Sequence, residues 1–588
     1  MILVHSILPA NPSQDCSEEK SETKVAALQI SRREKRWLVA FSVGIMLLTM
    51  LPYLCAWGIT PPGMRYQWLL YNPDEPNVHL AWMRQAADGH AAFVDLFTTE
   101  PQPRMFVHLL FLALGLLSRV LHLPLVTTYH AFRILAGILL LHSVYWLAAY
   151  FFRSVSLRRT AVWVTAVSSG LGWLAFTLNV AFTLNDGGSA NPDLWGLRPV
   201  DVSRGLMMPE GFTFPSLLLY PLFTFSMFLM VCCFLYLLWG MEGSSRKALI
   251  AAGLCGLILG NIHTYNLLVV YAVLFFYLLT GPNLKRASVL RPCGKVALFI
   301  AISCPGLIYQ YINFRTNPIF QEKALTLTHP QPPLDMAVSY GAVLALAVLG
   351  SAMLLERKRE EVFLVVWLFV GSAIIYAPVS FSRKLIEGLH IPMSILAAYA
   401  IVRLINGLLL KRRTVRSAGG GQQRRLRGVL IGVVVLGMSL SNVQFLKLVM
   451  EWVPENNASR LGALMPPYYL SEDDVAATEW LESHASEDAI VLCLPYLGSY
   501  LPSLTGKRVF IGHWAETLRF AEKLSWIRDF LGGGTPAGGM DALGESGQSV
   551  YFVYGLYERL VTPAWVPPPG WREVFQRGSA TVYQYTGT

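Results

Sequence analysis

Long apolar runs restrict the fold of this chain more than any other feature. A helix needs roughly 20 apolar residues to cross a hydrocarbon core of about 30 Å, and eleven runs come near that length. Lipid offers the backbone no hydrogen bonds, so such runs predict helices. We expect a mainly α, polytopic membrane helical bundle of about 11 spans. They lie near 37–57, 129–152, 160–182, 212–239, 248–263, 265–280, 296–312, 336–355, 362–381, 391–410 and 429–447.

The charge of the chain supports the same class. Charged residues make up 14% of the 588 residues, whereas soluble domains average roughly a quarter. The net charge of +10 would suggest nucleic acid in a soluble protein, but here the basic residues collect in short loops between the apolar runs. We therefore expect the lipid bilayer as a partner and no nucleic acid.

The basic loops predict the orientation in the membrane. One alternating set of loops holds 19 Lys and Arg in 53 residues, and the opposite set holds 10 in 128. Because Lys and Arg favour cytoplasmic loops, we expect a multi-pass protein of the cell membrane with a cytoplasmic N-terminus and 448–588 outside. The apolar stretch 104–122 would invert this pattern if it crossed, so we expect it to lie along the membrane surface.

Residues 448–588 change character. Ser471 and the acidic residues after it predict a helix start with a capping-box carboxylate, and the helix runs to about His484. A second helix is expected near 515–531, with apolar strands near 489–494, 508–511, 549–554 and 572–586. This alternation predicts a small C-terminal α/β domain. The chain then divides into a polar segment 1–36, a transmembrane domain 37–447 and an extracytoplasmic domain 448–588.

An acid pair in the first outer loop is the sharpest functional candidate. Asp74 and Glu75 stand between two prolines, fewer than twenty residues after the first predicted span. Ionisable groups at membrane depth are costly and usually mark a site where they converge. The structural alternative is a helix start, where carboxylates are favoured by the helix dipole.

Other ionisable residues fall at the mouths of spans on the same predicted face. Each has a plain structural alternative: the basic pair could anchor to lipid headgroups, and the hairpin histidine could be a satisfied structural residue. Asp186, Asp193 and Asp201 lie in a polar loop that favours solvated side chains. The candidates for a binding role are Glu210, His263, Arg383, Lys384 and His390.

With an Asp-Glu pair in the first outer loop, amphipathic segments behind it, many spans and an outer C-terminal domain, the chain resembles the GT-C class of membrane glycosyltransferases. The likeness is to the bacterial protein O-mannosyltransferase and aminoarabinose transferase branch. It covers roughly 37–450 as a layout, and residue by residue it extends to Asp74 and Glu75 alone. No segment matches the WWDxG signature of oligosaccharyltransferases, which puts asparagine glycosylation in doubt.

The resemblance implies transfer of a sugar from a polyprenyl-phosphate-linked donor to an extracytoplasmic acceptor in the cell envelope, with an acid of the first loop as the catalytic residue. A carboxylate at Asp74 or Glu75 can take the acceptor proton, while Arg383, Lys384, His390 and His263 can hold the leaving phosphate. A divalent metal between the acid pair and Glu210 is a further option. The sugar and the acceptor stay open.

Two other classes of function fit the same residues. A transporter or flippase of lipid-linked sugars would also place charges in an outer cavity, although no repeat between the two halves of the chain supports it. A non-catalytic membrane scaffold would use the outer domain to bind a partner. Only the enzyme consumes a polyprenyl-phosphate sugar.

Overall fold

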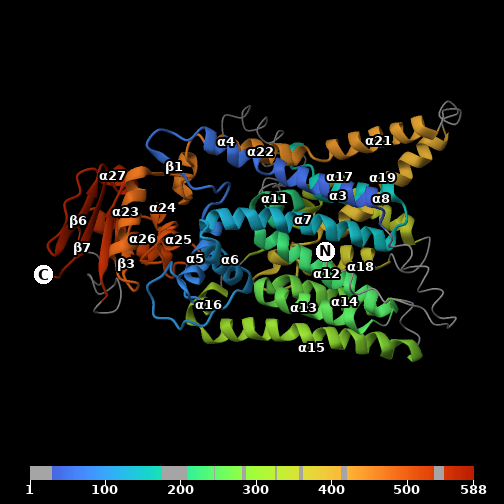
Figure 1. The fold of residues 1–588 in the computed structure, drawn as a ribbon, viewed down its shortest axis with the longest axis horizontal. Coiled ribbons are helices and arrows are strands. Elements are labelled where there is room, and N and C mark those ends of the chain that lie inside the picture. The colour runs from blue at the N-terminus through green and yellow to red at the C-terminus, as the bar shows by residue number, and fades with distance from the viewer. Residues whose placement is uncertain are drawn as a thin grey trace, which may run out of the picture. The chain divides into compact units, whose positions relative to one another are not determined.

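The computed structural model describes residues 30–174, 208–243, 245–280, 286–324, 328–355, 362–411, 420–534 and 548–587. Its elements form two compact units (Figure 1). The helical unit comprises the described residues of Met1–Thr49, Arg133–Gln310 and Leu327–Leu446. The mixed unit comprises the described residues of Met50–Phe132, Tyr311–Thr326 and Lys447–Thr588. It therefore joins the first-loop region to the C-terminal segment.

Six helices of the described chain are long and apolar enough to cross a membrane. They are Arg32–Gly58, Leu125–Phe151, Pro221–Gly243, Pro292–Thr316, Pro333–Leu355 and Ser382–Leu409. A pair bent by 44°, Gly421–Gly437 and Leu440–Trp452, makes a seventh if it is one span. The protein is therefore a multi-pass membrane protein, but the predicted count of eleven is not confirmed.

Shorter helices account for the difference. The predicted runs 248–263 and 265–280 become α13 (Arg246–Ile262) and α14 (Thr264–Leu278), which are separated at His263, where the backbone leaves the helical region. The run 362–381 forms α18 (Val362–Ile374), and the described part of 160–182 contains the end of α8 (Val155–Val167). The boundary at His263 agrees with the prediction, but α13, α14 and α18 have 17, 15 and 13 residues, which is too short to count as full spans.

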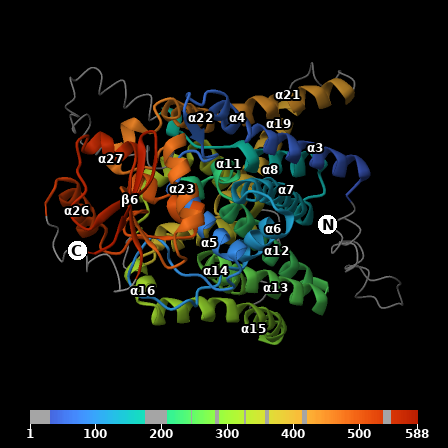
Figure 2. The ribbon, with the colours of Figure 1, turned by 60° about the vertical axis from the view of Figure 1, so that its left-hand side comes forward.

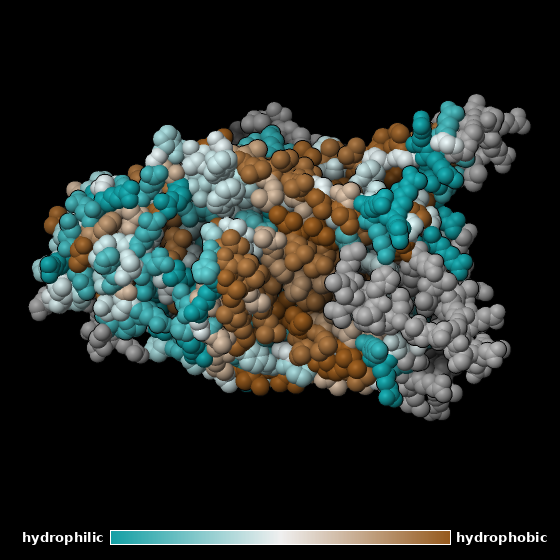
Figure 3. All heavy atoms as spheres, in the orientation of Figure 1, coloured by the Kyte–Doolittle hydropathy of each residue, from teal (hydrophilic) through white to brown (hydrophobic). Residues whose placement is uncertain are grey.

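The helical unit contains the long helices and the short helix α11. They are α3 (Arg32–Leu48), α7 (Leu125–Phe151), α11 (Thr213–Leu219), α12 (Pro221–Gly243), α15 (Arg286–Thr316), α17 (Pro333–Leu355), α19 (His390–Lys411), α21 (Gly420–Gly437) and α22 (Leu440–Trp452), several of which continue into the mixed unit. The most apolar part of the helix Ser382–Leu409 is completely buried inside the protein, whereas the most apolar part of Pro292–Thr316 in α15 is 22% buried. In Figure 3, apolar side chains gather over the helical part of the chain, and the C-terminal sheet region is mostly hydrophilic.

The C-terminal part of the mixed unit is a five-stranded sheet in the order β4-β3-β5-β7-β6. The strands are β3 (Ile490–Leu492), β4 (Arg508–Val509), β5 (Val550–Tyr554), β6 (Trp571–Arg577) and β7 (Ala580–Tyr585). β3 pairs in parallel with β4 and β5, and β7 pairs antiparallel with β5 and β6. The four predicted strand regions are confirmed, the last of them as a hairpin of two strands.

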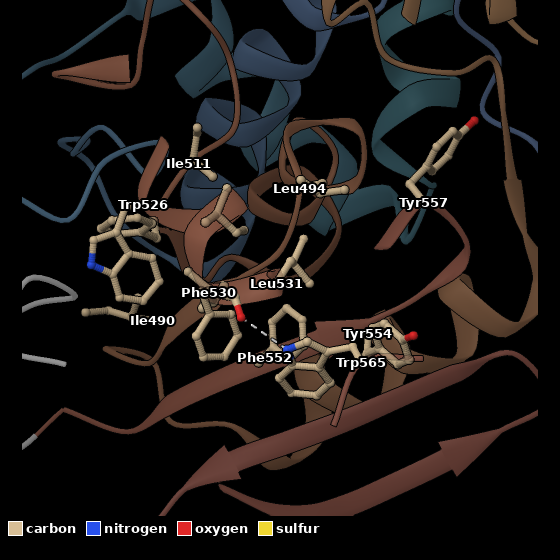
Figure 4. Close-up of a cluster of buried hydrophobic side chains, with 13 residues drawn as sticks. Ile490, Leu494, Ile511, Trp526, Phe530, Leu531, Phe552, Tyr554, Tyr557 and Trp565 are labelled. Atoms are coloured by element: carbon tan, nitrogen blue, oxygen red, sulfur yellow. Dashed lines mark hydrogen bonds between the residues drawn. The ribbon is translucent and has the colours of Figure 1, made fainter. Parts of the chain in front are cut away.

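Alternating side chains place one helix on each face of this sheet. Phe552 and Tyr554 of β5 pack with Trp526 and Phe530 of α26 (Phe520–Leu531), as Figure 4 shows. Tyr551 points to the other face, where Trp480 of α23 (Glu472–His484) stands edge-on to its ring at 6.1 Å. Figure 2 shows these two helices on either side of the strands. Period-two alternation therefore gives a helix-sheet-helix arrangement.

The expected start of α23 is confirmed at Ser471, whose hydroxyl accepts the amide of Asp474. The Asp474 carboxylate accepts the amide of Leu556, so it ties α23 to the residue after β5. Ser471 also ends β2 (Tyr469–Ser471), which pairs antiparallel with β1 (Met64–Tyr66) of the first-loop region. The two sequence ends of the mixed unit thus meet through backbone hydrogen bonds.

The first-loop region carries α4 (Leu51–Gly58), α5 (Asp74–Asp88) and α6 (Leu109–Leu121). α6 lies within the stretch 104–122 and has 13 residues, about 20 Å at 1.5 Å per residue, which is too short to cross a bilayer. The other short helices of the mixed unit are α16 (Pro318–Ala324), α24 (Pro495–Gly498), α25 (Leu501–Thr505) and α27 (Leu556–Val561).

Candidate active site

The acid pair opens α5. The helix begins at Asp74, so the acid pair does occupy a helix start, and Pro73 takes the N-cap position. The Asp74 Oδ1 atom accepts the amide of Glu75 at 3.0 Å. Asp74 is 2% exposed, whereas Glu75 is exposed. The two acids therefore have different surroundings, and only Asp74 is enclosed by protein.

His513 faces Asp74 from the loop after β4. Its Nε2 atom lies 3.6 Å from Asp74 Oδ2, and both side chains are almost fully buried. Its Nδ1 atom accepts the amides of Ala515 and Glu516 at 3.1 and 3.2 Å. A nitrogen that accepts two N–H groups carries no proton, so a neutral ring places its hydrogen on Nε2, toward Asp74.

Lys323 connects three segments beside this pair. Its Nζ atom lies 2.5 Å from Asp95 of the first loop and also contacts Glu516, which stands three residues after His513. Burial would lower the pKa of Lys323, but the charges of Asp95 and Glu516 outweigh burial and raise it. Burial raises the pKa of Asp95, with Lys323 opposing. The lysine therefore stays charged and holds the two carboxylates together.

Glu100 forms a second ionic contact between the first loop and the C-terminal part. Lys523 Nζ lies 2.8 Å from one carboxylate oxygen and Arg519 lies 2.9 Å from the other. Burial alone would raise the pKa of Glu100, but hydrogen bonds from Lys523, Thr98 and Arg519 lower it to about 2. The charged form of Glu100 is thus favoured by folding.

A cavity of about 550 Å³ opens along the exposed face of α5. Asn77, one helical turn after Asp74, lines it together with Tyr500 and Ser503, and the Ser503 hydroxyl donates to Asn77 Oδ1 at 3.2 Å. Arg119 and His122 line its other side, at the end of α6. The mixed unit therefore offers room for a polar group one turn from the buried acid.

Two of the predicted binding residues pair in the helical unit. Glu210 lies in a 3-10 turn, Pro209–Gly211, and Arg383 lies in another, Ser382–Ile386. The Arg383 Nε atom is 3.3 Å from Glu210 Oε1, and the arginine side chain is 41% exposed. Lys384 places its Nζ atom 5.1 Å from the centre of the Tyr265 ring. These cations are accessible enough to bind an anion.

His263 has a partner that the sequence did not single out. Its Nδ1 atom lies 3.5 Å from Glu387 Oε2, and Asn266 donates to Glu387 Oε1 at 2.6 Å. Glu387 is 1% exposed and is followed by Gly388, whose φ of +85° turns the chain into α19. A side chain at 388 would also collide with Met230. In the sequence, Glu387 is one of several charged residues of the loop 382–390, and nothing local marks it as buried.

His390 lies deeper than its predicted place at a loop mouth. Its Nδ1 atom lies 2.9 Å from the hydroxyl of Thr213 and its Nε2 atom 3.2 Å from that of Ser168, and all three side chains are buried. Both ring nitrogens thus have hydrogen-bonding hydroxyls. The structure brings His390 to these residues and not to the Glu210–Arg383 pair.

The predicted site residues fall in both units. Asp74 and Glu75 belong to the mixed unit, whereas Glu210, His263, Arg383, Lys384 and His390 belong to the helical unit, so their convergence stays a prediction. Asp186, Asp193 and Asp201 lie outside the described residues. Within the described part of the chain, no three His, Cys, Asp or Glu residues gather as metal ligands, so we derive no step through a metal.

Comparisons with known proteins bear on the fold. No model of a protein family matches the chain, and a search of curated proteins finds no match either. Among solved structures, ArnT from Cupriavidus metallidurans bound to undecaprenyl phosphate has a TM-score of 0.51 at 12% identity and covers 92% of this chain and 98% of its own. The arabinofuranosyltransferase AftD from Mycobacteria has a TM-score of 0.53 at 16% identity and covers 95% of this chain and 42% of its own. The chain thus shares its fold with ArnT and with AftD, in line with the fold that the resemblance implied.

Proposed function

We propose that this protein transfers a sugar from a polyprenyl-phosphate-linked donor to an acceptor outside the cytoplasm. The observation that carries the proposal is the buried carboxylate of Asp74 at the start of α5, one helical turn before Asn77, which lines a cavity, in a chain with this fold. ArnT, which shares the fold over nearly its whole length, is bound to undecaprenyl phosphate. This supports a lipid phosphate as the donor carrier.

The chemistry needs a base and a stabilised leaving group. An acceptor hydroxyl oxygen attacks the anomeric carbon, Asp74 takes the hydroxyl proton, and the bond from that carbon to the phosphate oxygen breaks. The electron pair leaves with the polyprenyl phosphate. Because the transition state resembles an oxocarbenium ion, a carboxylate near the reacting carbon lowers its energy. We assign Asp74 as the base and Glu75 as an acceptor contact.

The leaving phosphate gains negative charge as the bond breaks. Arg383 and Lys384 supply two positive charges on one turn, and Glu210 holds the Arg383 guanidinium by its Nε edge. A cation preset where charge develops stabilises the transition state. We assign Arg383 and Lys384 to the donor phosphate, with His263 and His390 as supporting residues in the same unit.

The test is consumption of the donor. The purified full chain would be incubated with a panel of radiolabelled undecaprenyl-phosphate sugars and envelope lipid extract as acceptor. Asp74→Asn is expected to lower turnover on the order of 10²- to 10⁴-fold, because the base is lost. Asp529→Asn, an exposed acid of α26, is the matched control. If the parental chain consumed no donor of the panel, the transporter and scaffold functions would replace this proposal.

The orientation is proposed with the function. We place the mixed unit's sheet outside the cytoplasm because of the Lys and Arg asymmetry between loops. Ser471 is buried, so Asp488, an exposed residue before β3, is the better labelling position. Asp488→Cys should react with an impermeant maleimide in intact cells above the parental background. Reaction only after lysis would place the sheet on the cytoplasmic side.

A further inference from the structure

The loop that carries His513 is fixed at both ends. The Gly512 amide donates to the Thr517 hydroxyl at 3.0 Å, and that hydroxyl donates to the carbonyl of Phe97 at 2.8 Å. A side chain at 512 would lie 2.6 Å from the carbonyl oxygen of Gly498, so only glycine fits there. The loop 512–517 is therefore held against both the first loop and the sheet region, which leaves His513 little freedom.

The neutral His513 ring is also held in one tautomer. Its Nδ1 atom faces two backbone N–H groups, so protonation there would set a third donor against them. The hydrogen therefore stays on Nε2. That atom is buried and has no hydrogen-bond partner within 3.5 Å among the described residues, and an acceptor, Asp74 Oδ2, lies 3.6 Å away. Closing the gap requires a movement of a few tenths of an ångström.

We propose that His513 is a positioning residue for Asp74, a role that rests on the proposed function of that carboxylate. An Nε2–H directed at Oδ2 sets the orientation of the Asp74 carboxylate. His513 is not itself a base, because Nδ1 is occupied by amides and Nε2 carries the hydrogen. A side chain needed only for packing would not have to place a buried N–H group toward a carboxylate, as His513 does.

Lys323 extends this support. The backbone amide of Glu516 donates to His513 Nδ1, and the Glu516 carboxylate contacts Lys323, which also contacts Asp95. The ring is thus connected through one residue to an ionic cluster that joins the first loop, α16 and the C-terminal part. The orientation of Asp74 then depends on three segments that are far apart in the sequence.

The test uses two substitutions of the ring. His513→Phe keeps a planar ring but removes the Nε2–H, together with the Nδ1 acceptor of the Ala515 and Glu516 amides. We expect kcat to fall about 10- to 100-fold with KM nearly unchanged, since Asp74 loses the donor directed at it. His513→Gln keeps an N–H donor at a similar reach and should recover most of that loss. His484→Phe, at an exposed position of α23, is the matched control.

A double variant separates positioning from folding. If His513 acts through Asp74, His513→Phe should change the residual rate less than about threefold in an Asp74→Asn background, because there is no charged form left to orient. Equal losses in both backgrounds, or no recovery by Gln, would overturn the proposal. The parental chain's donor consumption, measured alongside, tests the proposed function separately.

Discussion

Each unit of this protein contains one buried carboxylate beside one histidine, and the two pairs are built differently. In the mixed unit, His513 Nε2 is 3.6 Å from Asp74, and backbone amides fix the other ring nitrogen. In the helical unit, His263 Nδ1 is 3.5 Å from Glu387, which also accepts a hydrogen bond from Asn266. Backbone amides of a loop thus fix the histidine of the first pair, whereas a side chain of a neighbouring helix, Asn266, contacts the carboxylate of the second pair.

This difference separates two uses of a buried acid. Asp74 stands at the start of a helix one turn from a cavity, where a substrate can approach. Glu387 is enclosed by apolar helices of a membrane-spanning unit, where removing one partner of a buried pair leaves the other uncompensated. We infer that the pair of the mixed unit serves chemistry and that the pair of the helical unit holds its surroundings together.

The largest expected effect comes from exchanging each carboxylate for its amide. Asp74→Asn should lower turnover by about 10²-fold or more because the base is lost. Glu387→Gln keeps a hydrogen-bonding group for Asn266 and should stay within about tenfold of the parental rate. Initial rates with the same undecaprenyl-phosphate sugar compare the two. A larger loss at Glu387 would reverse the assignment of the pairs.

An intermediate effect is expected on stability. His263→Leu leaves the buried Glu387 with Asn266 as its hydrogen-bonding side chain and should destabilise the protein by about 3 kcal/mol. His513→Phe removes the acceptor of the part-buried amides of Ala515 and Glu516 and should cost about 1 kcal/mol. Thermal unfolding in detergent measures both. Adding Glu387→Leu to His263→Leu should recover part of the loss. If both variants lowered the unfolding temperature equally, the two pairs would contribute equally to stability, and this prediction would be wrong.

The smallest effect concerns pH and the mixed unit alone. Because the pKa of Glu100 is lowered from 4.5 to about 2, its contribution is fully present above pH 4.5 and disappears as the pH falls toward 2. The group is partly exposed, so we expect about 1 kcal/mol after solvent screening. Glu100→Gln should therefore unfold at a lower temperature than the parental chain at pH 6. The difference in unfolding temperature between the two proteins should become smaller below pH 4. A difference that became larger there would contradict the lowered pKa of Glu100.

Much of the fold follows from patterns that one sequence displays. Apolar runs identify the helices, and the alternation in 549–554 identifies the central strand. Both patterns arise because the residues of one helix or one strand that are buried follow a regular spacing in the sequence. The number of full spans does not follow in the same way. The break at His263 was predicted as the limit between the runs 248–263 and 265–280, but the helices on either side of it have only 17 and 15 residues and so do not count as full spans.

The site was only partly predictable for a related reason. Asp74 stood out because it is charged, follows a span and opens a helix. Its partner His513 is 439 positions away, and a single histidine in Gly512-His513-Trp514 gives no local sign of what it faces. Glu387 lay within a segment already noted for Arg383 and Lys384, whose charges suggested a solvent-facing turn. Contacts between distant segments, not local pattern, determined both.

The pairing of β1 with β2 has a consequence for how the protein is made. Met64 of β1 lies opposite Ser471 of β2, so the ribosome must add about 400 residues between them. At a synthesis rate of roughly 5–20 residues per second, β1 has an unpaired edge for some 20 to 80 s before β2 is synthesised. Until then Asp74 lacks the wall that encloses it, and open edges invite wrong pairing. A chain that ends before β2 therefore contains Asp74 but leaves it exposed, so cellular proteases and chaperones can recognise it as unfolded.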